Sequence, residues 1–276
     1  GGEAPKLLIR SKKYKNIWID TYKKKFYQPY KHYLVKFPRN NRAEIDCNIL
    51  RAEYYFYQEL NELGFNTIET TEMKLIEGEK YPSLWLPRFD VEWHNQQWHR
   101  HGLESVYSVL NKASGSYLNH FEVIENLCDL LTLIDSEFDS AQFTCEWLQR
   151  DLLNIIFGNS DNHGRNTSFL KKSGKISLAP IYDFAPMKAD PEVVTRSTTW
   201  GSPYEEGGEY RWDKITQKLA HLCDPNLSLT TLKSLASNLV GLKQRLINKG
   251  VPKQIIEMPA LSFNYVESKL ERWELL

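Results

Sequence analysis

The feature that most constrains the fold of this chain is a polar segment, Gly158–Asn166, that lies between two regular elements. Before it, apolar residues recur at helical spacing from Glu146 to Phe157, and the glycine that follows favours the end of a helix. After it, Thr167–Leu170 and Lys175–Leu178 flank a Lys-Lys-Ser-Gly turn, which predicts a β-hairpin. We expect Asp183 to end the second strand, so that the hairpin returns it to the polar segment.

Three side chains of this region have the chemistry that phosphoryl transfer needs. A loop aspartate can position and deprotonate an attacking hydroxyl, and Asp161 is placed to do so. Oxygen atoms of Asn and Asp side chains are the ligands that Mg²⁺ prefers, which makes Asn166 and Asp183 the expected metal ligands. Asn and Asp are also common in turns, where they tolerate left-handed backbone. Because the two halves of the motif flank one hairpin, we favour an ATP- and Mg²⁺-dependent kinase.

Two further residues of the polar segment are compatible with more than one role. His163 stands two residues after Asp161, where it would orient that aspartate, contact a phosphate or fill space. Arg165 would meet a phosphate or remain solvated. We include His163 among the catalytic residues, and both side chains among those that bind the nucleotide.

A nucleotide kinase also needs a lysine that contacts the phosphates, and Lys36 is the candidate. It lies in the apolar strand His32–Phe37, where a charged side chain is costly unless it is paired. A phosphate would pair with it, and so would an acid on the next helix, for which we prefer Glu53 to Glu44. The alternative is an exposed lysine on an edge strand. We assign Lys36 both a catalytic and a nucleotide-binding role.

The start of the chain is a second candidate for phosphate binding. Gly1 and Gly2 precede the first expected strand, and Lys6 begins it. The backbone N–H groups of a glycine-rich loop cradle anions, so we place these three residues in the nucleotide site. A Gly-Gly pair at the start of a chain is a weak signal by itself.

The order of the expected elements divides the chain into two parts. Residues 1–88 are predicted to contain one helix, Arg42–Leu63, and strands at 6–10, 16–19, 32–37, 70–76 and 83–86. Residues 89–276 are predicted to be mainly helical, with helices near 121–134, 146–157, 229–247 and 263–275 and the single hairpin. This is an α+β chain with a small β-rich lobe, then a larger helical lobe, and the boundary near Pro87–Trp93.

Composition argues against several other classes of protein. No apolar run approaches the roughly 18 residues that a membrane helix needs, and no signal peptide is visible. His94, His99 and His101 do not have the spacing of a zinc site, so we expect a polar loop there. Four scattered cysteines are typical of unpaired thiols in a reducing cytoplasm, where we therefore place the protein: Cys47, Cys128, Cys145 and Cys223.

The net charge is zero, but the charge is unevenly distributed. From Lys6 to Arg42 there are twelve Lys or Arg residues and one acid, Asp20, with aromatic residues between them. Such a basic strip is compatible with a surface for nucleic acid or an acidic partner. We favour a solvated β-ribbon whose lysines protect an exposed edge, and leave direct nucleic-acid binding open.

Over nearly its whole length the chain resembles the HipA family of bacterial serine/threonine kinase toxins. The most specific matches are the polar segment 158–166 and Leu178–Asp183, which occur in the expected order. The other matching segments are Gly1–Lys6, Val35–Pro38, Arg51–Glu53 and Arg88–Asp90. The chain departs from the pattern at Pro87, where some members have an acidic residue.

The resemblance implies a two-lobed, protein-kinase-like fold with ATP between an N-lobe (1–88) and a C-lobe (89–276). It implies that Asp161 is the general base, that Asn166 and Asp183 hold Mg²⁺, and that Lys36 contacts phosphates. Pro87, Arg88 and Phe89 would contact adenine. Family members phosphorylate a serine or threonine on aminoacyl-tRNA synthetases, arrest growth, and are restrained by a DNA-binding antitoxin.

Two other functions remain compatible with the sequence. Aminoglycoside and choline kinases use a related Asp…Asn…Asp set, so a small-molecule phosphotransferase is the first alternative. The second is a catalytically silent module that binds nucleic acid through the basic strip. Retention of Asp161, Asn166, Asp183 and Lys36 argues against a silent protein, because such a protein has no chemical need for all four.

Overall fold

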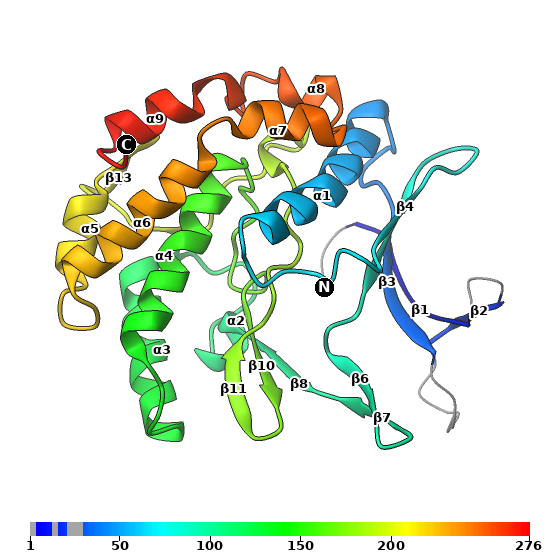
Figure 1. Ribbon diagram of the computed structural model, residues 1–276, viewed down its shortest axis with the longest axis horizontal. Helices are drawn as coiled ribbons and strands as arrows, with labels where there is room; N and C mark the ends of the chain where they lie inside the picture. The colour runs from blue at the N-terminus through cyan, green and yellow to red at the C-terminus, as the bar shows by residue number, and fades with distance from the viewer. Residues whose placement is uncertain (1–3, 13–15, 21–29) are drawn as a thin grey trace.

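The computed structural model describes residues 4–12, 16–20 and 30–276, which form a mixed α/β fold (Figure 1). Its strands are β1 (Lys6–Lys12), β2 (Asn16–Ile19), β3 (Lys31–Lys36), β4 (Lys74–Ile76), β5 (Ser83–Pro87), β6 (Val91–His94), β7 (Gln97–Arg100), β8 (Gly102–Ser105), β9 (Leu118–Asn119), β10 (Ser168–Lys172), β11 (Lys175–Leu178), β12 (Thr198–Thr199), β13 (Glu205–Glu206) and β14 (Glu209–Tyr210). Its α-helices are α1 (Glu44–Glu62), α2 (Val106–Val109), α3 (His120–Ile134), α4 (Ser140–Ile156), α5 (Trp212–Lys218), α6 (Pro225–Leu239), α7 (Leu242–Lys249), α8 (Lys253–Ile256) and α9 (Val266–Arg272). Short 3₁₀ helices occur at η1 (Met187–Ala189) and η2 (Phe263–Tyr265).

The N-terminal strands form one antiparallel sheet in the order β2-β1-β3-β5-β4. All five were predicted from the β-branched and aromatic residues of this part of the chain, although β4 is shorter than the predicted strand at 70–76. The register between β1 and β3 places Lys6 directly opposite Lys36. Side chains that are directly opposite lie on the same face of a sheet, so both lysines extend from one end of one face.

Helix α1 lies between this sheet and the C-terminal helices α7 and α8 (Figure 1). Its first turn is stabilised by Asp46, whose carboxylate accepts the Ala43 backbone N–H at 2.8 Å. It ends before Gly64, which has a φ of +85°. On its buried face the ring of Phe56 contacts the rings of Phe157 and Phe184, with centroids 4.9 and 6.2 Å apart. The core therefore continues from α1 into the helical part of the chain.

The helical part departs from the predicted elements between α6 and α7. A single helix was expected over 229–247, but the chain forms α6 and α7 with a break between them. Val240 leaves the helix, and Gly241 takes a left-handed φ of +74°. The apolar period continues across the break because both helices pack on the same core, and this continuity made the two appear as one.

The predicted hairpin is present as β10 and β11, and β8 joins it to form a three-stranded sheet. Its turn residues Ser173 and Gly174 both have positive φ, as a two-residue hairpin turn requires. Asp183 does not end the second strand, which is a correction to the prediction. Strand β11 stops at Leu178, and the chain then passes Thr67, where Ile181 forms a parallel bridge.

The expected polar loop around His94–His101 is instead a hairpin of β6 and β7. Its turn consists of Asn95 and Gln96, with φ values of +49° and +59°. Because no glycine marks this turn, the usual hairpin signal is missing from the sequence. Among the described residues, no helix has the length and apolar character needed to cross a membrane.

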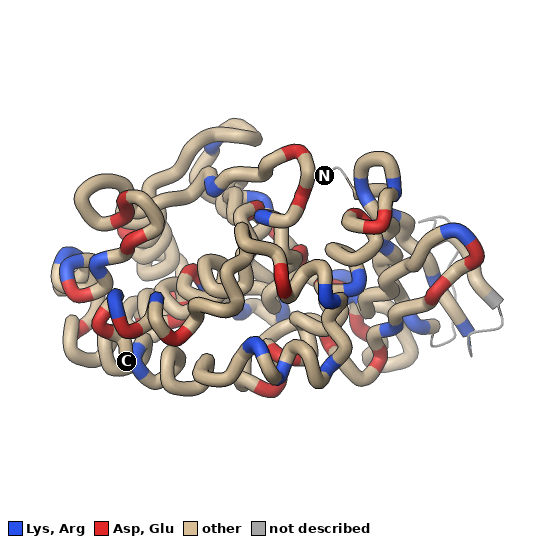
Figure 2. The backbone as a smooth tube through the Cα atoms, turned by 90° about the horizontal axis from the view of Figure 1, so that it is seen from above, with Lys and Arg blue, Asp and Glu red and all other residues tan. Residues whose placement is uncertain are grey.

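Basic and acidic positions are interspersed along the described chain (Figure 2). Several described residues of the basic strip contact acids of the same chain. These pairs are Lys6–Asp183, Arg10–Asp20, Lys31–Glu72, Lys36–Glu53 and Arg39–Asp190. A substantial share of the strip's charge is therefore neutralised within the molecule.

Candidate active site

The polar segment between α4 and β10 is anchored at its first residues. Gly158 has a φ of +69°, and a Cβ atom there would collide with Cδ2 of Leu261, so only glycine fits. Its carbonyl accepts the backbone N–H groups of Ser160 and Lys188, at 3.1 and 2.9 Å. The hydroxyl of Ser160 donates to the carbonyl of Val194. Later parts of the chain thereby fix the start of the segment.

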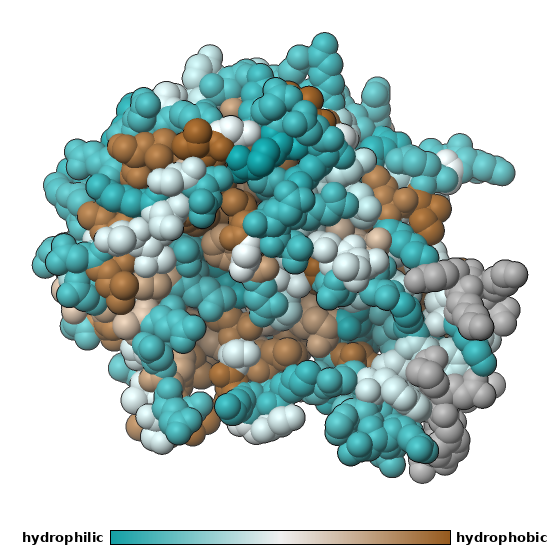
Figure 3. Space-filling view, viewed as in Figure 1, coloured by the Kyte–Doolittle hydropathy of each residue, from teal (hydrophilic) through white to brown (hydrophobic). Residues whose placement is uncertain are grey.

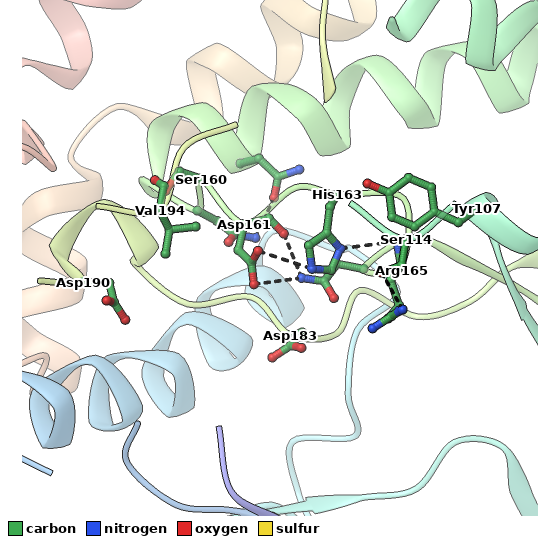
Figure 4. A network of polar contacts seen from close by, with 12 residues as sticks. Tyr107, Ser114, Ser160, Asp161, His163, Arg165, Asp183, Asp190 and Val194 are labelled. Atoms are coloured by element: carbon green, nitrogen blue, oxygen red, sulfur yellow. Dashed lines mark hydrogen bonds and ion pairs between the residues drawn. The ribbon is translucent and has the colours of Figure 1, made fainter. Parts of the chain in front are cut away.

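Asp161 is held from two sides by residues of its own loop (Figure 4). Nδ2 of Asn166 donates to the Asp161 carbonyl at 2.7 Å and lies 3.3 Å from Oδ2. Nε2 of His163 lies 3.3 Å from Oδ1. Nδ1 of His163 accepts the Arg165 backbone N–H at 3.3 Å, so the proton of a neutral ring is on Nε2, facing the carboxylate. The geometry thus gives His163 a part in orienting Asp161.

Gly164 lets the polar segment approach α2 and β9 closely. A Cβ atom at this position would lie 2.7 Å from Cδ1 of Tyr107 and 2.9 Å from Cδ1 of Leu118. The backbone N–H of Tyr107 donates to the Gly164 carbonyl at 3.0 Å, and the Tyr107 ring stacks on that of His163, with centroids 6.2 Å apart. The loop that presents Asp161 and His163 therefore depends on a residue without a side chain.

Lys36 is the centre of a buried ion-pair network. Its Nζ lies 2.7 and 2.6 Å from the two carboxylate oxygens of Glu53, and 2.6 Å from Oδ1 of Asp183. Nζ of Lys6, on the neighbouring strand, lies 3.2 Å from Oδ2 of Asp183. Lys36 is only 4% exposed and Glu53 only 1%, whereas Glu44 is exposed in the first turn of α1. Glu53 is thus the acid on α1 that contacts this lysine.

Contacts within the network determine its charge states. Burial opposes the positive charge of Lys36, but Asp183 and Glu53 outweigh it and raise the pKa of the amine above its ordinary value. Burial also opposes ionisation of Asp183, yet Lys36 and Lys6 hold the pKa of that carboxyl below its usual range. The amine and the carboxylate are therefore both charged at neutral pH.

Helix α1 contributes a second residue to this network, which the sequence analysis missed. Oη of Tyr57 donates to Oε1 of Glu53 at 2.9 Å and accepts the backbone N–H of Phe184 at 3.3 Å. Burial, followed by the charges of Glu53 and Asp183, raises the pKa of Tyr57 well above its ordinary value, so the hydroxyl keeps its proton. Asp183 has a φ of +54°, which is rare for residues with a side chain, and this hydrogen bond fixes the next residue. The i, i+4 spacing of Glu53 and Tyr57 is the signal that would have indicated it.

The segment that carries Asp183 is also tied to the polar segment. The hydroxyl of Tyr182 donates to the Arg165 carbonyl at 2.6 Å and contacts the hydroxyl of Ser168 at 2.5 Å. Burial raises the pKa of Tyr182 to about 12. These contacts hold Asp183 and Asn166 at the wall of the same cavity, although the whole hairpin separates them in sequence.

Two adjoining cavities meet at these residues. Asp161 lines the smaller one, of about 330 Å³, and Asn166 lines the larger, of about 1160 Å³. Apolar side chains line much of the larger cavity, and Figure 3 shows apolar residues in a hollow near the β10–β11 hairpin. Both cavities are lined by Lys6, Lys36, His163, Arg165 and Asp183. The ion-pair network thus stands where the two cavities join.

The three residues predicted to contact adenine, Pro87, Arg88 and Phe89, all line the larger cavity. The guanidinium of Arg88 is engaged in ion pairs. Its Nε lies 2.9 Å from Oδ1 of Asp90, and its Nη1 lies 3.1 Å from Oδ2 of Asp20. The side chain of Arg88 therefore holds this segment in place beside the N-terminal sheet.

Arg165 lines both cavities, and its Nη2 donates to the hydroxyl of Ser114 at 2.6 Å. Ser114 belongs to the loop after α2, which the sequence analysis did not single out. The predicted phosphate-covering residues Gly1 and Gly2 lie outside the described residues. Lys6, from the same predicted loop, contacts Asp183 at the junction of the cavities.

The donor set of Asn166 and Asp183 fits a divalent cation. The amide nitrogen of Asn166 is used in its contacts with Asp161, which leaves the amide oxygen as the acceptor. Mg²⁺ is usually held by one or two protein ligands together with phosphate oxygens and water. The described residues contain no group of three or more His, Cys, Asp or Glu side chains that could hold a metal ion without other ligands. The residues therefore suit a cation that binds together with phosphates.

A second buried ion pair lies next to the polar segment and was not predicted. Asp151 of α4 accepts hydrogen bonds from Nη2 of Arg196 at 3.0 and 3.1 Å, and from Nε1 of Trp200 at 2.8 Å. Burial opposes ionisation of Asp151, but Arg196 and then His120 hold the pKa of its carboxyl below the usual range. This pair anchors the chain after Asp183 to the helix that precedes the polar segment.

Solved structures with a similar fold include the HipA of Shewanella oneidensis MR-1, from a toxin–antitoxin complex of HipA, HipB and operator DNA. Its TM-score is 0.70 at 17% identity, and the match covers 99% of this chain and 64% of that one. The Helicobacter pylori proinflammatory kinase CtkA matches with a TM-score of 0.54 at 15% identity, covering 92% of this chain and 93% of that one. This chain therefore spans less than two thirds of the solved HipA chain. No curated protein sequence matches it.

The sequence itself matches a family model along most of its length. The model describes the HipA-like C-terminal domain, and it matches residues 1–242 of the 276. The matched region includes Lys36, Glu53, the polar segment and Asp183. The chain therefore belongs to the family of HipA-like C-terminal domains.

Proposed function

We propose that the chain is an ATP- and Mg²⁺-dependent serine/threonine protein kinase of the HipA type that acts in the cytoplasm and inhibits growth. The expected substrate is a protein, by family resemblance an aminoacyl-tRNA synthetase. The expected partner is a DNA-binding antitoxin, which the solved complex of HipA with HipB and operator DNA supports. We also propose that residues 1–88 and 89–276 act as the two lobes of a kinase fold, with the nucleotide between them.

One observation carries this proposal. A cationic lysine, a base candidate, an amide and a carboxylate that is a candidate metal ligand meet around two adjoining cavities, although they come from three separate parts of the chain. They are Lys36, Asp161, Asn166 and Asp183. These are the groups that phosphoryl transfer requires, because the enzyme's work is to position the acceptor and to neutralise charge.

Each side chain has a defined part in the proposed reaction. An oxygen of the Asp161 carboxylate receives the proton of the acceptor hydroxyl, while His163 keeps the carboxylate turned toward the smaller cavity. Lys36 stays cationic because Glu53 and Asp183 raise its pKa, and its charge faces phosphate oxygens. Asn166 and Asp183 would hold Mg²⁺. Bound Mg²⁺–ATP supplies the phosphoryl group and the metal charge that neutralises the phosphates.

Phosphate transfer by an Asp161→Asn variant tests the proposal. The wild type, incubated with Mg²⁺, γ-labelled ATP and a bacterial lysate, should label a protein. In the variant the transfer rate should fall by about 10²–10⁴-fold, because a general base is lost, while calorimetry should show little change in ATP affinity. Asp129→Asn is the matched control, because Asp129 is exposed on α3 and lines neither cavity. Transfer by Asp161→Asn at the wild-type rate would show that Asp161 is not the base.

The size of the smaller cavity is also compatible with a second function, that of a small-molecule phosphotransferase. Its volume of about 330 Å³ is at the lower end of the range for small-molecule sites, so a small hydroxyl acceptor also fits there. The incubation described above separates the two functions. A labelled protein supports the protein kinase, and a labelled soluble metabolite supports a small-molecule phosphotransferase.

A further inference from the structure

Helices α7 and α8 pack along α1, the helix that carries Glu53 (Figure 1). Both lie almost entirely beyond residue 242, where the match to the family model ends. Nδ2 of Asn48 in α1 donates to Oε1 of Gln254 in α8 at 2.8 Å. The rings of Phe56 in α1 and Phe263 in η2 are in contact, with centroids 6.2 Å apart. The C-terminal segment thus supports the helix on which the lysine–glutamate pair depends.

An ion pair with a buried acid also joins these elements. Glu59 of α1 is 1% exposed, and its Oε1 lies 2.7 Å from Nε of Arg245 in α7. The other two nitrogens of the Arg245 guanidinium donate to the carbonyls of Val240 and Asn238, at 2.6 and 2.8 Å. Nζ of Lys249 lies 3.5 Å from Oε2 of Glu59. Arg245 therefore joins α1 to the break between α6 and α7.

The spacing of the two glutamates on α1 gives this contact a function. Glu53 and Glu59 are six residues apart, so their side chains leave the helix in directions roughly 120° apart. One direction leads to Lys36 and the other to Arg245. Polar contacts at two points around the helix axis oppose its rotation more strongly than the Glu53 contact alone, and they act together with the ring contacts of Phe56. Rotation of α1 is what would move Glu53 away from Lys36.

We propose that Arg245 is a positioning residue for phosphoryl transfer. By pairing with Glu59 it adds a second polar restraint on the rotation of α1 and so helps to keep Glu53 against Lys36. Arg245 lines neither cavity and touches none of the proposed reacting groups. The expected effect of Arg245 on the reaction rate rests on the proposed kinase function. The expected effect of Arg245 on the position of α1 does not.

Steady-state kinetics with a double-mutant cycle test the effect on rate. Arg245→Ala should lower kcat/KM for ATP by roughly tenfold. An effect of this size is typical of the coupling between residues in one network of contacts. Arg245→Lys should restore most of the loss. In a Glu53→Gln background, Arg245→Ala should lower kcat/KM by less than about twofold, because the pair that it positions is already broken. An equal loss in both backgrounds would overturn the proposal, since a merely structural role acts independently of Glu53.

The controls separate positioning from folding. Glu59→Gln/Arg245→Gln removes both charges together and leaves no unpaired ion in the interior, so it should fold and still lose activity. Lys243→Ala is the matched control, because Lys243 lies on the same helix but contacts Asn264 rather than α1. Lys243→Ala should keep wild-type kinetics, and a loss there as large as in Arg245→Ala would overturn the proposal.

Chemical labelling of Lys36 gives a readout that needs no phosphate transfer. Buried and paired, Lys36 should react slowly with an amine-directed acylating reagent in the wild type and several-fold faster in Arg245→Ala, as measured by mass spectrometry of the Lys36 peptide. Equal labelling in folded wild type and folded variants overturns the proposal. A wild type that transfers no phosphate refutes the kinase function instead, and the labelling result still decides whether Arg245 positions α1.

Discussion

Replacement of Lys36 with methionine should expose how much the buried network contributes to folding. Methionine occupies a similar volume, but it leaves Glu53 and Asp183 without the amine that contacts both at 2.6–2.7 Å. Removal of one partner from a buried ion pair costs about 3–5 kcal/mol, because it leaves an uncompensated charge. For 276 residues, about 2.1 cal/mol/K per residue gives an unfolding entropy of about 580 cal/mol/K. The melting temperature at pH 7 should therefore fall by roughly 5–9 °C.

The pH dependence of that loss distinguishes charge from packing. In the wild type the pKa of Asp183 is lowered, so its contribution to stability is present above the unfolded value of about 3.9 and is lost as the pH falls toward the folded value. In the variant the two carboxylates face each other, and the pKa of one of them rises. A group with a raised folded pKa stabilises the protein once it is protonated. The deficit of the variant should therefore shrink as the pH falls from 7 to about 5.

Differential scanning calorimetry across this pH range is the measurement, and Lys31→Met is the control. Lys31 lies on the same strand, but its ion pair with Glu72 is half-exposed and should contribute at most about 1 kcal/mol. If Lys36→Met melts together with the wild type at pH 7, or if its deficit is the same at pH 5, the account of the network as a buried charge cluster is wrong.

Two further predictions concern the neighbours of this network. Asp183→Asn should keep the fold but lose most of the Mg²⁺-dependent part of its ATP affinity, because an amide is a poorer metal ligand than a carboxylate. Titration calorimetry with and without Mg²⁺ measures this, and titrations identical to those of the wild type would count against the metal role. Gly164→Ala should destabilise the protein by about 1–3 kcal/mol and lower the transfer rate, because the new Cβ would lie 2.7 Å from Cδ1 of Tyr107. A variant as stable in thermal melting and as active as the wild type would show that the loop can move away without cost.

The sequence predicted the elements whose signal is local. Alternating β-formers marked β1 to β3, the apolar period marked α1 and α4, and a Ser-Gly turn marked the β10–β11 hairpin. Where the local signal was ambiguous, the prediction was wrong. The break at Gly241 lies inside a continuous apolar period, and the turn at Asn95 and Gln96 has no glycine. Tertiary packing decided both cases.

The same distinction applies to the candidate site. Asp161, Asn166 and Asp183 were predicted as site residues because their residue types and order carry information about chemistry, and all three line the two adjoining cavities. The ion pairs that hold the surrounding elements in place were missed, because the two residues of each pair are distant in sequence. Arg196 and Asp151 are 45 positions apart, and Glu59 and Arg245 are 186 apart. Neither pair leaves a pattern in one sequence. Tyr57 is the exception, since its helical spacing from Glu53 was visible.

The lysines around Asp183 have a consequence for how a divalent cation would bind where the two cavities join. Without such a cation, Lys6 and Lys36 already act as counterions for this carboxylate. A metal that binds Asp183 would therefore compete with the ammonium groups for this carboxylate, and a lysine released by that competition would be available to an incoming polyanion. Cation and anion loading are coupled by this exchange, so each should bind weakly by itself and more tightly in the presence of the other.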